Sequence, residues 1–289
     1  MQSRDTHSLI ISGMVLFVGL CLSYFVVANY QQTQAEFRQT RFQSLVDKTY
    51  SHLQERVLSY EHGLRGMRGA FLAAGPSEMT RQKFRLVFES RDLAKEFPGS
   101  RGFGYIQRVL PSNEKDFLLD VAKRDHEVFQ IRQLSENSEE RFVIKYLEPE
   151  ALNRSAIGLD IGSESNRRAA MLKAIRSGRA SITRPITLVQ ANGFVGQGFL
   201  LLLALYPEYP IVKDEVSREA TALGATYTPL VIEEVLENIN PIGDGISLSL
   251  SDVDSSAGNV VFYRAGKAIE SYPELAITRR FDVFGREWL

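Results

Sequence analysis

The chain of 289 residues has one cysteine, Cys21, and only four histidines. A disulfide needs two thiols and a cysteine-based metal site needs more, so neither forms within one copy of the chain. The histidines lie at positions 7, 52, 62 and 126, without the paired spacing that is typical of a zinc site. We therefore expect no metal site and no cofactor.

The motifs of common enzymes are also missing. The sequence has no P-loop, no dinucleotide-binding glycine fingerprint, no nucleophile elbow and no protein-kinase signature. Asp252–Gly258 resembles the opening of a calcium loop, but the loop's sixth residue is not glycine and its twelfth is Tyr263 rather than glutamate. A polar hairpin turn is the favoured interpretation of this stretch. We expect no catalytic residue in this segment.

Charge of one sign is lacking as well. The formal net charge is -1, from 34 lysines and arginines against 35 acidic residues. Such a balance provides no long-range field that attracts a phosphate backbone. The basic pairs Arg167-Arg168 and Arg279-Arg280 are more typical of solvated faces than of a groove that follows nucleic acid. We therefore expect no nucleic-acid partner.

One long apolar run lies near the N-terminus. Leu9–Ala28 would span about 30 Å as a helix, which is the thickness of the hydrocarbon core of a bilayer. A secretory signal peptide has a shorter apolar region and a small-residue cleavage site, whereas this run is followed by Asn29-Tyr30, with an aromatic residue at the interface. The pattern favours an uncleaved anchor over a signal peptide. We predict a cytoplasmic tail over 1–7 and a transmembrane helix over 8–29.

A heptad rhythm follows the predicted anchor. Apolar residues recur at alternating intervals of four and three: Val46, Tyr50, Leu53, Val57, Tyr60, Leu64, Met67 and Phe71. We predict a stalk helix over 30–75 that ends at Gly75-Pro76. Its apolar stripe fits packing on the chain's own domain, favoured near Gly63–Gly75, or a coiled-coil seam between two copies. We expect this helix to form a homodimer.

Helix-like and strand-like segments alternate after Pro76. Helices are predicted at 77–90, 112–125 with Ser112 as N-cap, 163–177 closed by Gly178, and 229–238. Strands are predicted at 101–109, 142–147, 182–190, 198–206, 246–251, 260–264 and 280–288, with a turn at Asn192-Gly193. The apolar run Gly198–Leu205 is too short to span a membrane and predicts a buried strand. The order predicts an α+β fold with antiparallel sheets.

Several short strings in this region carry a family resemblance. In chain order they are RGFGYIQRV at 101–109, YLEP at 146–149, GLD at 158–160, SIT at 181–183, ITLVQ at 186–190 and GFL at 198–200. Together they resemble the CHASE domain, an extracytoplasmic sensor found on histidine kinases and nucleotide cyclases. The closing string FGREW at 284–288 resembles the end of that domain. The resemblance covers roughly residues 80–289.

The resemblance implies two PAS-like α/β lobes on a stalk helix. The membrane-distal lobe, 76–220, would bind a small-molecule ligand, and the membrane-proximal lobe would be 221–289. A second membrane helix and a histidine kinase or diguanylate cyclase would follow Leu289, and the segment itself would not be an enzyme. The sensor would then lie in the periplasm, anchored in the bacterial inner membrane. Two alternatives from other classes are a membrane-tethered periplasmic hydrolase and an adaptor that binds a partner protein.

The resemblance also indicates where a ligand would bind. In plant cytokinin receptors of this family, an acid near the start of a helix and a threonine on a strand hold the ligand. Counted from Gly178 and Tyr206, these places fall here on Arg167 and Leu202, so an anionic ligand suits the site better than a cytokinin. The expected ligand-binding residues are Tyr105, Tyr146, Asp160, Arg167, Arg168, Thr187, Val189 and Leu202.

Four of these positions have a structural alternative. Asp160 fits a helix cap or a loop as well as a ligand contact. Arg168 fits a pocket or an ion pair with a surface acid. Tyr105 and Tyr146 fit the hydrophobic core.

Overall fold

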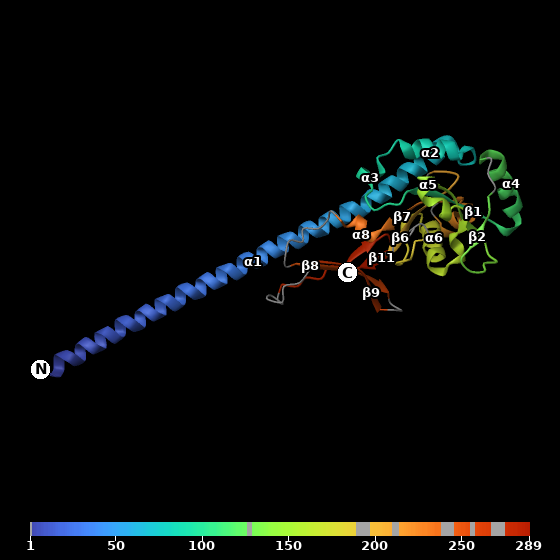
Figure 1. Cartoon of the computed structure of the whole chain (residues 1–289). Coiled ribbons are helices and arrows are strands. Elements are labelled where there is room, and N and C mark those ends of the chain that lie inside the picture. The colour runs from blue at the N-terminus through green and yellow to red at the C-terminus, as the bar shows by residue number, and fades with distance from the viewer. Residues whose placement is uncertain are drawn as a thin grey trace. The chain divides into compact units, whose positions relative to one another are not determined.

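The structure is a computed structural model that describes residues 2–125, 129–188, 197–209, 214–237, 246–254, 258–266 and 275–289. The chain divides into two units, Met1–Tyr50 with Glu270–Ile277 and Ser51–Ile269 with Thr278–Leu289. Its α-helices are α1 Gln2–Ala74, α2 Arg81–Glu89, α3 Leu93–Glu96, α4 Glu114–Asp125, α5 Glu150–Asn153, α6 Ser165–Ser177, α7 Glu215–Thr221 and α8 Ile232–Val235 (Figure 1). Helices and antiparallel strands together make the expected α+β fold.

The N-terminal part of α1 carries the apolar run. Its most apolar 18-residue window has a mean hydropathy of 1.8, and none of that window is buried. Within the described residues, α1 is the one helix that is long and apolar enough to cross a membrane. A signal sequence near the N-terminus satisfies the same criterion, so the uncleaved anchor stays a prediction.

The C-terminal part of α1 packs on its own domain. The heptad residues Leu53, Tyr60, Leu64, Met67 and Phe71 are all buried within one chain. The Phe71 ring lies 4.4 Å from the Tyr105 ring of the sheet, centroid to centroid. The apolar seam from Leu53 to Phe71 therefore packs within the chain. Packing on the chain's own domain was the interpretation favoured near Gly63–Gly75. Dimerisation through α1 stays a prediction.

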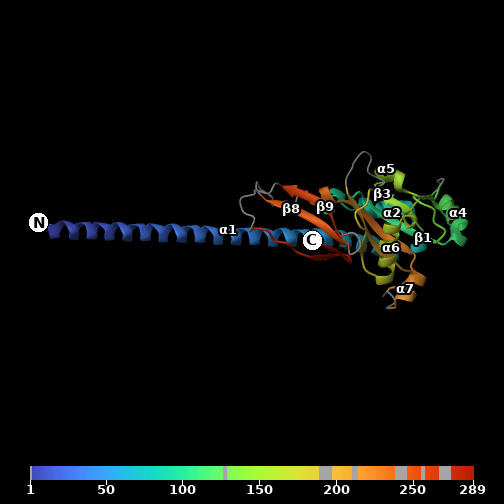
Figure 2. The same ribbon diagram turned by 90° about the horizontal axis from the view of Figure 1, so that it is seen from below.

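Seven strands form the first sheet, in the order β2-β4-β3-β1-β7-β6-β5. They are β1 Phe103–Val109, β2 Arg132–Gln133, β3 Arg141–Glu148, β4 Leu159–Asp160, β5 Ser181–Ile182, β6 Gly198–Leu205 and β7 Gly224–Val231. All pairings are antiparallel except that of β2 with β4. Every residue of β6 is buried, as its continuous apolar sequence predicts. Figures 1 and 2 show α2, α4, α5 and α6 grouped around this sheet.

The predicted helix at 229–238 is wrong over its first three residues. Pro229–Val231 ends β7, and α8 covers only Ile232–Val235. Pro229 is typical of a helix start, but β1 and β6 on either side of β7 supply ladder partners for the whole strand. The first sheet consequently extends past residue 220, where the second lobe was expected to begin.

The second sheet has the order β10-β11-β8-β9. Its strands are β8 Ser247–Asp254, β9 Gly258–Gly266, β10 Phe281–Val283 and β11 Arg286–Trp288. The predicted strand at 280–288 is thus two strands, separated by a turn at Phe284-Gly285 where both φ angles are positive. Asp252, at the start of the calcium-like stretch, is buried. Its carboxylate accepts a hydrogen bond of 2.7 Å from Nε of Arg286. This ion pair joins β8 to β11, and the antiparallel pairing of Asp254 in β8 with Gly258 in β9 fits the polar hairpin interpretation.

The remaining local predictions differ in detail. Ser112 lies within a 3-10 turn, Pro111–Asn113, so it does not cap α4, which begins at Glu114. Gly178 closes α6 in the left-handed conformation with φ of 67°, as predicted. Of the strand expected at 182–190, the described residues 182–188 show only the end of β5 and an isolated bridge between Ile186 and Gly198. The turn expected at Asn192-Gly193 lies outside the described residues.

We predict that Leu64→Ala destabilises the chain and that Leu58→Ala does not. Leu64 is 0% exposed, and its truncation leaves a cavity that costs about 3 kcal/mol. Leu58, on the same helix, is 47% exposed and serves as the matched control. The measurement is urea unfolding of the detergent-solubilised chain at several protein concentrations. A Leu64→Ala loss that grows on dilution would show that the seam packs between copies instead.

Candidate ligand-binding site

Different helices cover the two faces of the first sheet. Tyr105 and Tyr146 point to the face that is covered by α1 and α2, because Tyr105 stacks near Phe71 and the Tyr146 ring lies 5.5 Å from the Phe84 ring. Leu202 lies on the other face, in one buried cluster with α6 residues such as Met171. We call these the stalk face and the α6 face. The expected site residues are therefore not all in one place.

The two tyrosines are core residues of the stalk face. The Tyr105 hydroxyl donates to the carbonyl of Leu223 at 3.4 Å, and the Tyr146 hydroxyl donates to the carbonyl of Met79 at 3.2 Å. Burial raises the pKa of Tyr105 above its ordinary value. A cavity of about 780 Å³ lies beside Tyr105, open to solvent and also lined by Phe117 and Lys145. Both tyrosines therefore pack in the hydrophobic core, which was their structural alternative. Tyr105 also borders this cavity.

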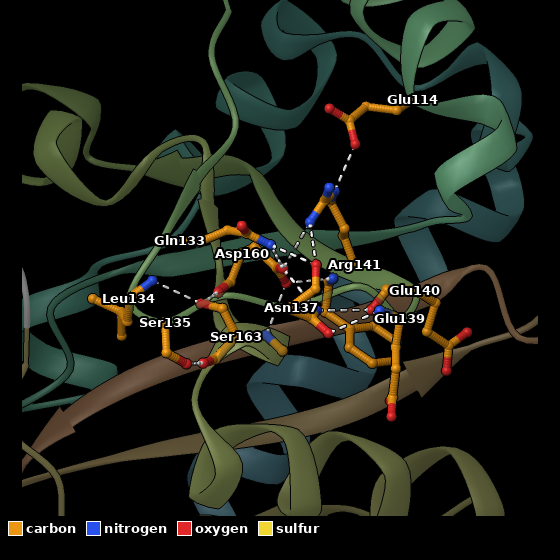
Figure 3. A network of polar contacts seen from close by, with 12 residues as sticks. Glu114, Gln133, Leu134, Ser135, Asn137, Glu139, Glu140, Arg141, Asp160 and Ser163 are labelled. Atoms are coloured by element: carbon orange, nitrogen blue, oxygen red, sulfur yellow. Dashed lines mark hydrogen bonds and ion pairs between the residues drawn. The ribbon is translucent and has the colours of Figure 1, made fainter.

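Asp160 is the centre of a polar network at the edge of the sheet (Figure 3). Its carboxylate is fully buried and accepts hydrogen bonds from the backbone N–H groups of Phe142 at 2.8 Å and Gly162 at 2.9 Å. The side-chain amides of Asn137, at 3.1 Å, and Gln133, at 3.5 Å, donate to the other oxygen. Four donors occupy the acceptor capacity of one carboxylate. Asp160 thus caps the 3-10 turn that begins at Ile161 and holds the loop around Asn137. This is the structural alternative to a ligand contact.

Arg168 is tied to acids next to this network. Its Nη1 donates to the carbonyl of Glu140 at 3.0 Å, and its Nη2 forms an ion pair with Glu139. The guanidinium also lies 5.5 Å from the centre of the Phe142 ring. These partners satisfy the cation at the protein surface. In the structure Arg168 therefore forms the ion pair with a surface acid that was its structural alternative.

Arg167 differs sharply from its neighbour. It lies in the first turn of α6, where the Glu164 side chain caps the helix by accepting from the N–H groups of Asn166 and Arg167. Spacing of three, four and seven places Arg167 on the same helical stripe as the buried Ala170, Met171 and Ala174. The side chain therefore points under α6, and the residue is only 5% exposed.

Few partners compensate the buried guanidinium of Arg167. Nη2 donates to the carbonyl of Thr187 at 2.9 Å, and Nε lies 3.8 Å from a carboxylate oxygen of Glu164. Among the described residues, neither Nε nor Nη1 makes a hydrogen bond. Burial lowers the pKa of the guanidinium, and the nearby Glu164 and Tyr227 partly oppose that shift. The side chain remains a cation with unused donors in an apolar interior.

A row of cross-strand neighbours lies opposite α6. Strand register pairs Ser181 with Leu202, Leu202 with Tyr227, Tyr227 with Gly104 and Gly104 with Leu147. Directly paired residues share a face, so the row faces α6. The hydroxyls of Ser181 and Tyr227 are buried and have no hydrogen-bond partner in the described part of the chain.

Gly104 makes room for the Tyr227 ring. A Cβ at Gly104 would lie far inside van der Waals distance of Cε1 of that ring, and 2.6 Å from the carbonyl oxygen of Tyr146. Burial raises the pKa of the Tyr227 hydroxyl well above its ordinary value, and Arg167 opposes the shift, so the two groups are electrostatically coupled. Sequence patterns did not identify Tyr227 or Ser181, because the pairing of Tyr227 with a glycine becomes visible only once the strand register is known.

The structure thus brings together part of the expected set. Arg167, the Thr187 carbonyl and Leu202 lie between α6 and the sheet, while the Thr187 side chain is exposed. Val189 lies outside the described residues. No group of three potential metal ligands occurs among the residues that the structure describes.

Comparison with known proteins shows the family of the chain. Residues 77–263, more than half of the chain, match the CHASE domain. The chain belongs to the CHASE domain family. CHASE domains are sensors rather than enzymes, so this segment is a sensor region with an extracellular role. No curated protein matches the chain.

Among the solved structures that match this CHASE chain is a receptor from a bacterium. It is an extracellular ligand binding receptor from Desulfohalobium retbaense DSM5692, with a TM-score of 0.49 and 10% sequence identity. The similarity covers 86% of the CHASE chain and 39% of the receptor chain. The CHASE chain therefore spans well under half the length of that receptor.

We predict that Gly104→Ala destabilises the CHASE domain by about 2 kcal/mol, because the added methyl group displaces the Tyr227 ring in a packed interior. Gly69→Ala is the control, since its Cβ meets no atom within 4 Å on α1. That change should stabilise the helix by up to about 1 kcal/mol. Urea unfolding measures both. Equal stability of the Gly104 variant and the wild type would contradict the ring placement.

Proposed function

We propose that this CHASE domain senses a small anionic molecule that binds between α6 and the first sheet. The observation that carries the proposal is the buried Arg167, whose donors are only partly used. Buried charges in proteins are normally paired, because an unpaired one costs several kcal/mol. Glu164 offsets the Arg167 charge only at 3.8 Å, and an anionic ligand would supply acceptors for the unused Nε and Nη1.

Strands β6 and β7 offer a route from this site to the stalk. Tyr227 and Leu202 face α6, whereas the neighbouring Thr226 donates through Oγ1 to the carbonyl of Leu64 in α1 at 3.2 Å. Arg68 of α1 donates to the carbonyl of Ala204 in β6 at 3.4 Å. A shift of either strand on ligand binding would therefore move groups that touch α1. Signalling then requires that the ligand prefers one arrangement of this contact over the other.

The wider assignment belongs to the same proposal. Leu9–Ala28 anchors the chain in the bacterial inner membrane, and the sensor lies in the periplasm. The first sheet forms the membrane-distal PAS-like lobe, and the second forms the membrane-proximal lobe. Two copies dimerise through the part of the stalk at 30–52, which precedes the seam that packs within the chain. A histidine kinase or a diguanylate cyclase receives the signal.

The two rival functions differ in their support. A periplasmic hydrolase is not favoured, because the matched family is a sensor family. An adaptor that binds only a partner protein needs no small-molecule site. It leaves the unused donors of Arg167 without a role.

A thermal-shift panel of anionic, neutral and cationic metabolites tests the proposal on the full chain in detergent, with Arg167→Met and Arg168→Met as paired variants. An anion present at 100 times its Kd should stabilise the wild type by about 2.7 kcal/mol. Arg168→Met should respond equally, because that side chain pairs with surface acids. Arg167→Met should lose the response while keeping or gaining stability without ligand, because an apolar replacement removes a poorly compensated buried charge.

Two results would contradict this assignment. A panel without any stabilising metabolite would favour the adaptor. Equal responses of Arg167→Met and the wild type would place the ligand elsewhere, with the cavity beside Tyr105 as the next candidate.

A further inference from the structure

The Tyr227 hydroxyl is a second unused donor beneath α6. It is fully buried on the central strand β7, and no described residue accepts a hydrogen bond from it. Tyrosine hydroxyls in protein interiors normally find a partner, because a buried polar group without one costs free energy. Phenylalanine would fill the same space at no such cost. The hydroxyl is therefore a feature that packing alone does not explain.

Arg167 and Tyr227 lie on the two surfaces that enclose the α6 interior. Arg167 continues the buried stripe of α6, and Tyr227 stands in the sheet row that this stripe covers. Each has donors without an acceptor among the described residues: Nε and Nη1 of Arg167, and the Tyr227 hydroxyl, which can also accept. A ligand group that satisfies both must accept several hydrogen bonds and carry negative charge.

The charges around Arg167 limit the charge of that ligand group. One guanidinium is present, and the Glu164 carboxylate near its Nε already offsets part of the positive charge. A doubly charged phosphate would leave negative charge uncompensated in an interior where unpaired charge is costly. A carboxylate, with one charge and two acceptor oxygens, matches one guanidinium and one hydroxyl.

The remaining lining is apolar. Leu202 stands beside Tyr227 in the row, and Met171, Leu188 and Ile186 belong to the same buried cluster. Such surroundings favour a carbon skeleton over further polar groups on the ligand. They also exclude inorganic anions as well-matched ligands.

We propose that Arg167 and Tyr227 together bind the carboxylate of a small organic monocarboxylic acid. This inference rests on the proposed sensor function and names its ligand class and a second specificity residue. Arg167 supplies the charge, and the Tyr227 hydroxyl donates to one carboxylate oxygen. Gly104 is a positioning residue, because it leaves the space in which the Tyr227 ring lies.

Matched pairs of acids and amides test the ligand class. The probes are acetate, propionate, butyrate and benzoate, each beside its carboxamide, with inorganic phosphate as a separate probe. Binding to the full chain in detergent is measured by thermal shift and by titration calorimetry. At least one acid should bind and stabilise the wild type, while its amide and phosphate do not.

Tyr227→Phe and Tyr206→Phe then test the second residue. Tyr227→Phe should weaken binding of the acid by about 10-fold to 100-fold, the loss expected for one hydrogen bond to a charged group. Its stability without ligand should not fall, since the hydroxyl has no partner to lose. Tyr206 is the control, because its buried hydroxyl donates to the carbonyl of Ile175. Tyr206→Phe should therefore lower stability and leave the affinity for the acid unchanged.

The outcomes separate this inference from the sensor function. Binding of phosphate or another anion that is not a carboxylate, with no response to any acid, would overturn the carboxylate class and leave the proposed anion sensor in place. Binding of neutral metabolites alone would overturn the anionic ligand in both proposals. An acid that binds Tyr227→Phe as tightly as the wild type would remove Tyr227 from the site. If neither these acids nor the wider metabolite panel stabilises the wild type, both proposals fail.

Discussion

Strands β6 and β7 of this CHASE domain are covered on both faces, by α1 on one side and by α6 on the other. All residues of both strands are buried, so each alternate side chain belongs to one of two separate interiors. Thr226 and Tyr227 illustrate the division, because the first bonds to α1 and the second faces α6. A closely packed interior transmits displacement instead of absorbing it. The same two strands can therefore join a ligand site to a stalk.

The buried charged side chains of this domain differ in how far hydrogen bonds compensate their charge. Asp160 accepts four hydrogen bonds, and Asp252 forms a two-pronged ion pair with Arg286, so both carboxylates are compensated. Arg167 is as deeply buried, yet two of its three nitrogens make no hydrogen bond to a described residue. An unsatisfied buried polar group costs about 1–3 kcal/mol. Such a cost is expected to be retained at functional sites, which supports the proposed role of Arg167.

Sequence periodicity predicted most elements, because each depends on local patterns. The apolar run of β6, the closing glycine of α6 and the end of α1 at Gly75 are examples. Local pattern failed where neighbours decide the conformation, as at Pro229, which became the end of a central strand. The candidate site was predicted only at Arg167, Leu202 and the Thr187 backbone. Tyr227 could not be identified, since its relation to Gly104 depends on which strands pair.

The family resemblance and the structure both support the proposed ligand chemistry. In the cytokinin receptors, an acid and a threonine suit a ligand that donates hydrogen bonds. Here Arg167 stands at the place of the acid, so hydrogen-bond donors replace an acceptor. Leu202 stands at the place of the threonine, so an apolar side chain replaces a polar one. Both differences support the proposed ligand, which has a negative, hydrogen-bond-accepting end and a carbon skeleton. The unused Tyr227 hydroxyl adds a donor from a strand that the resemblance did not implicate, so the proposed accepting ligand has support beyond the resemblance.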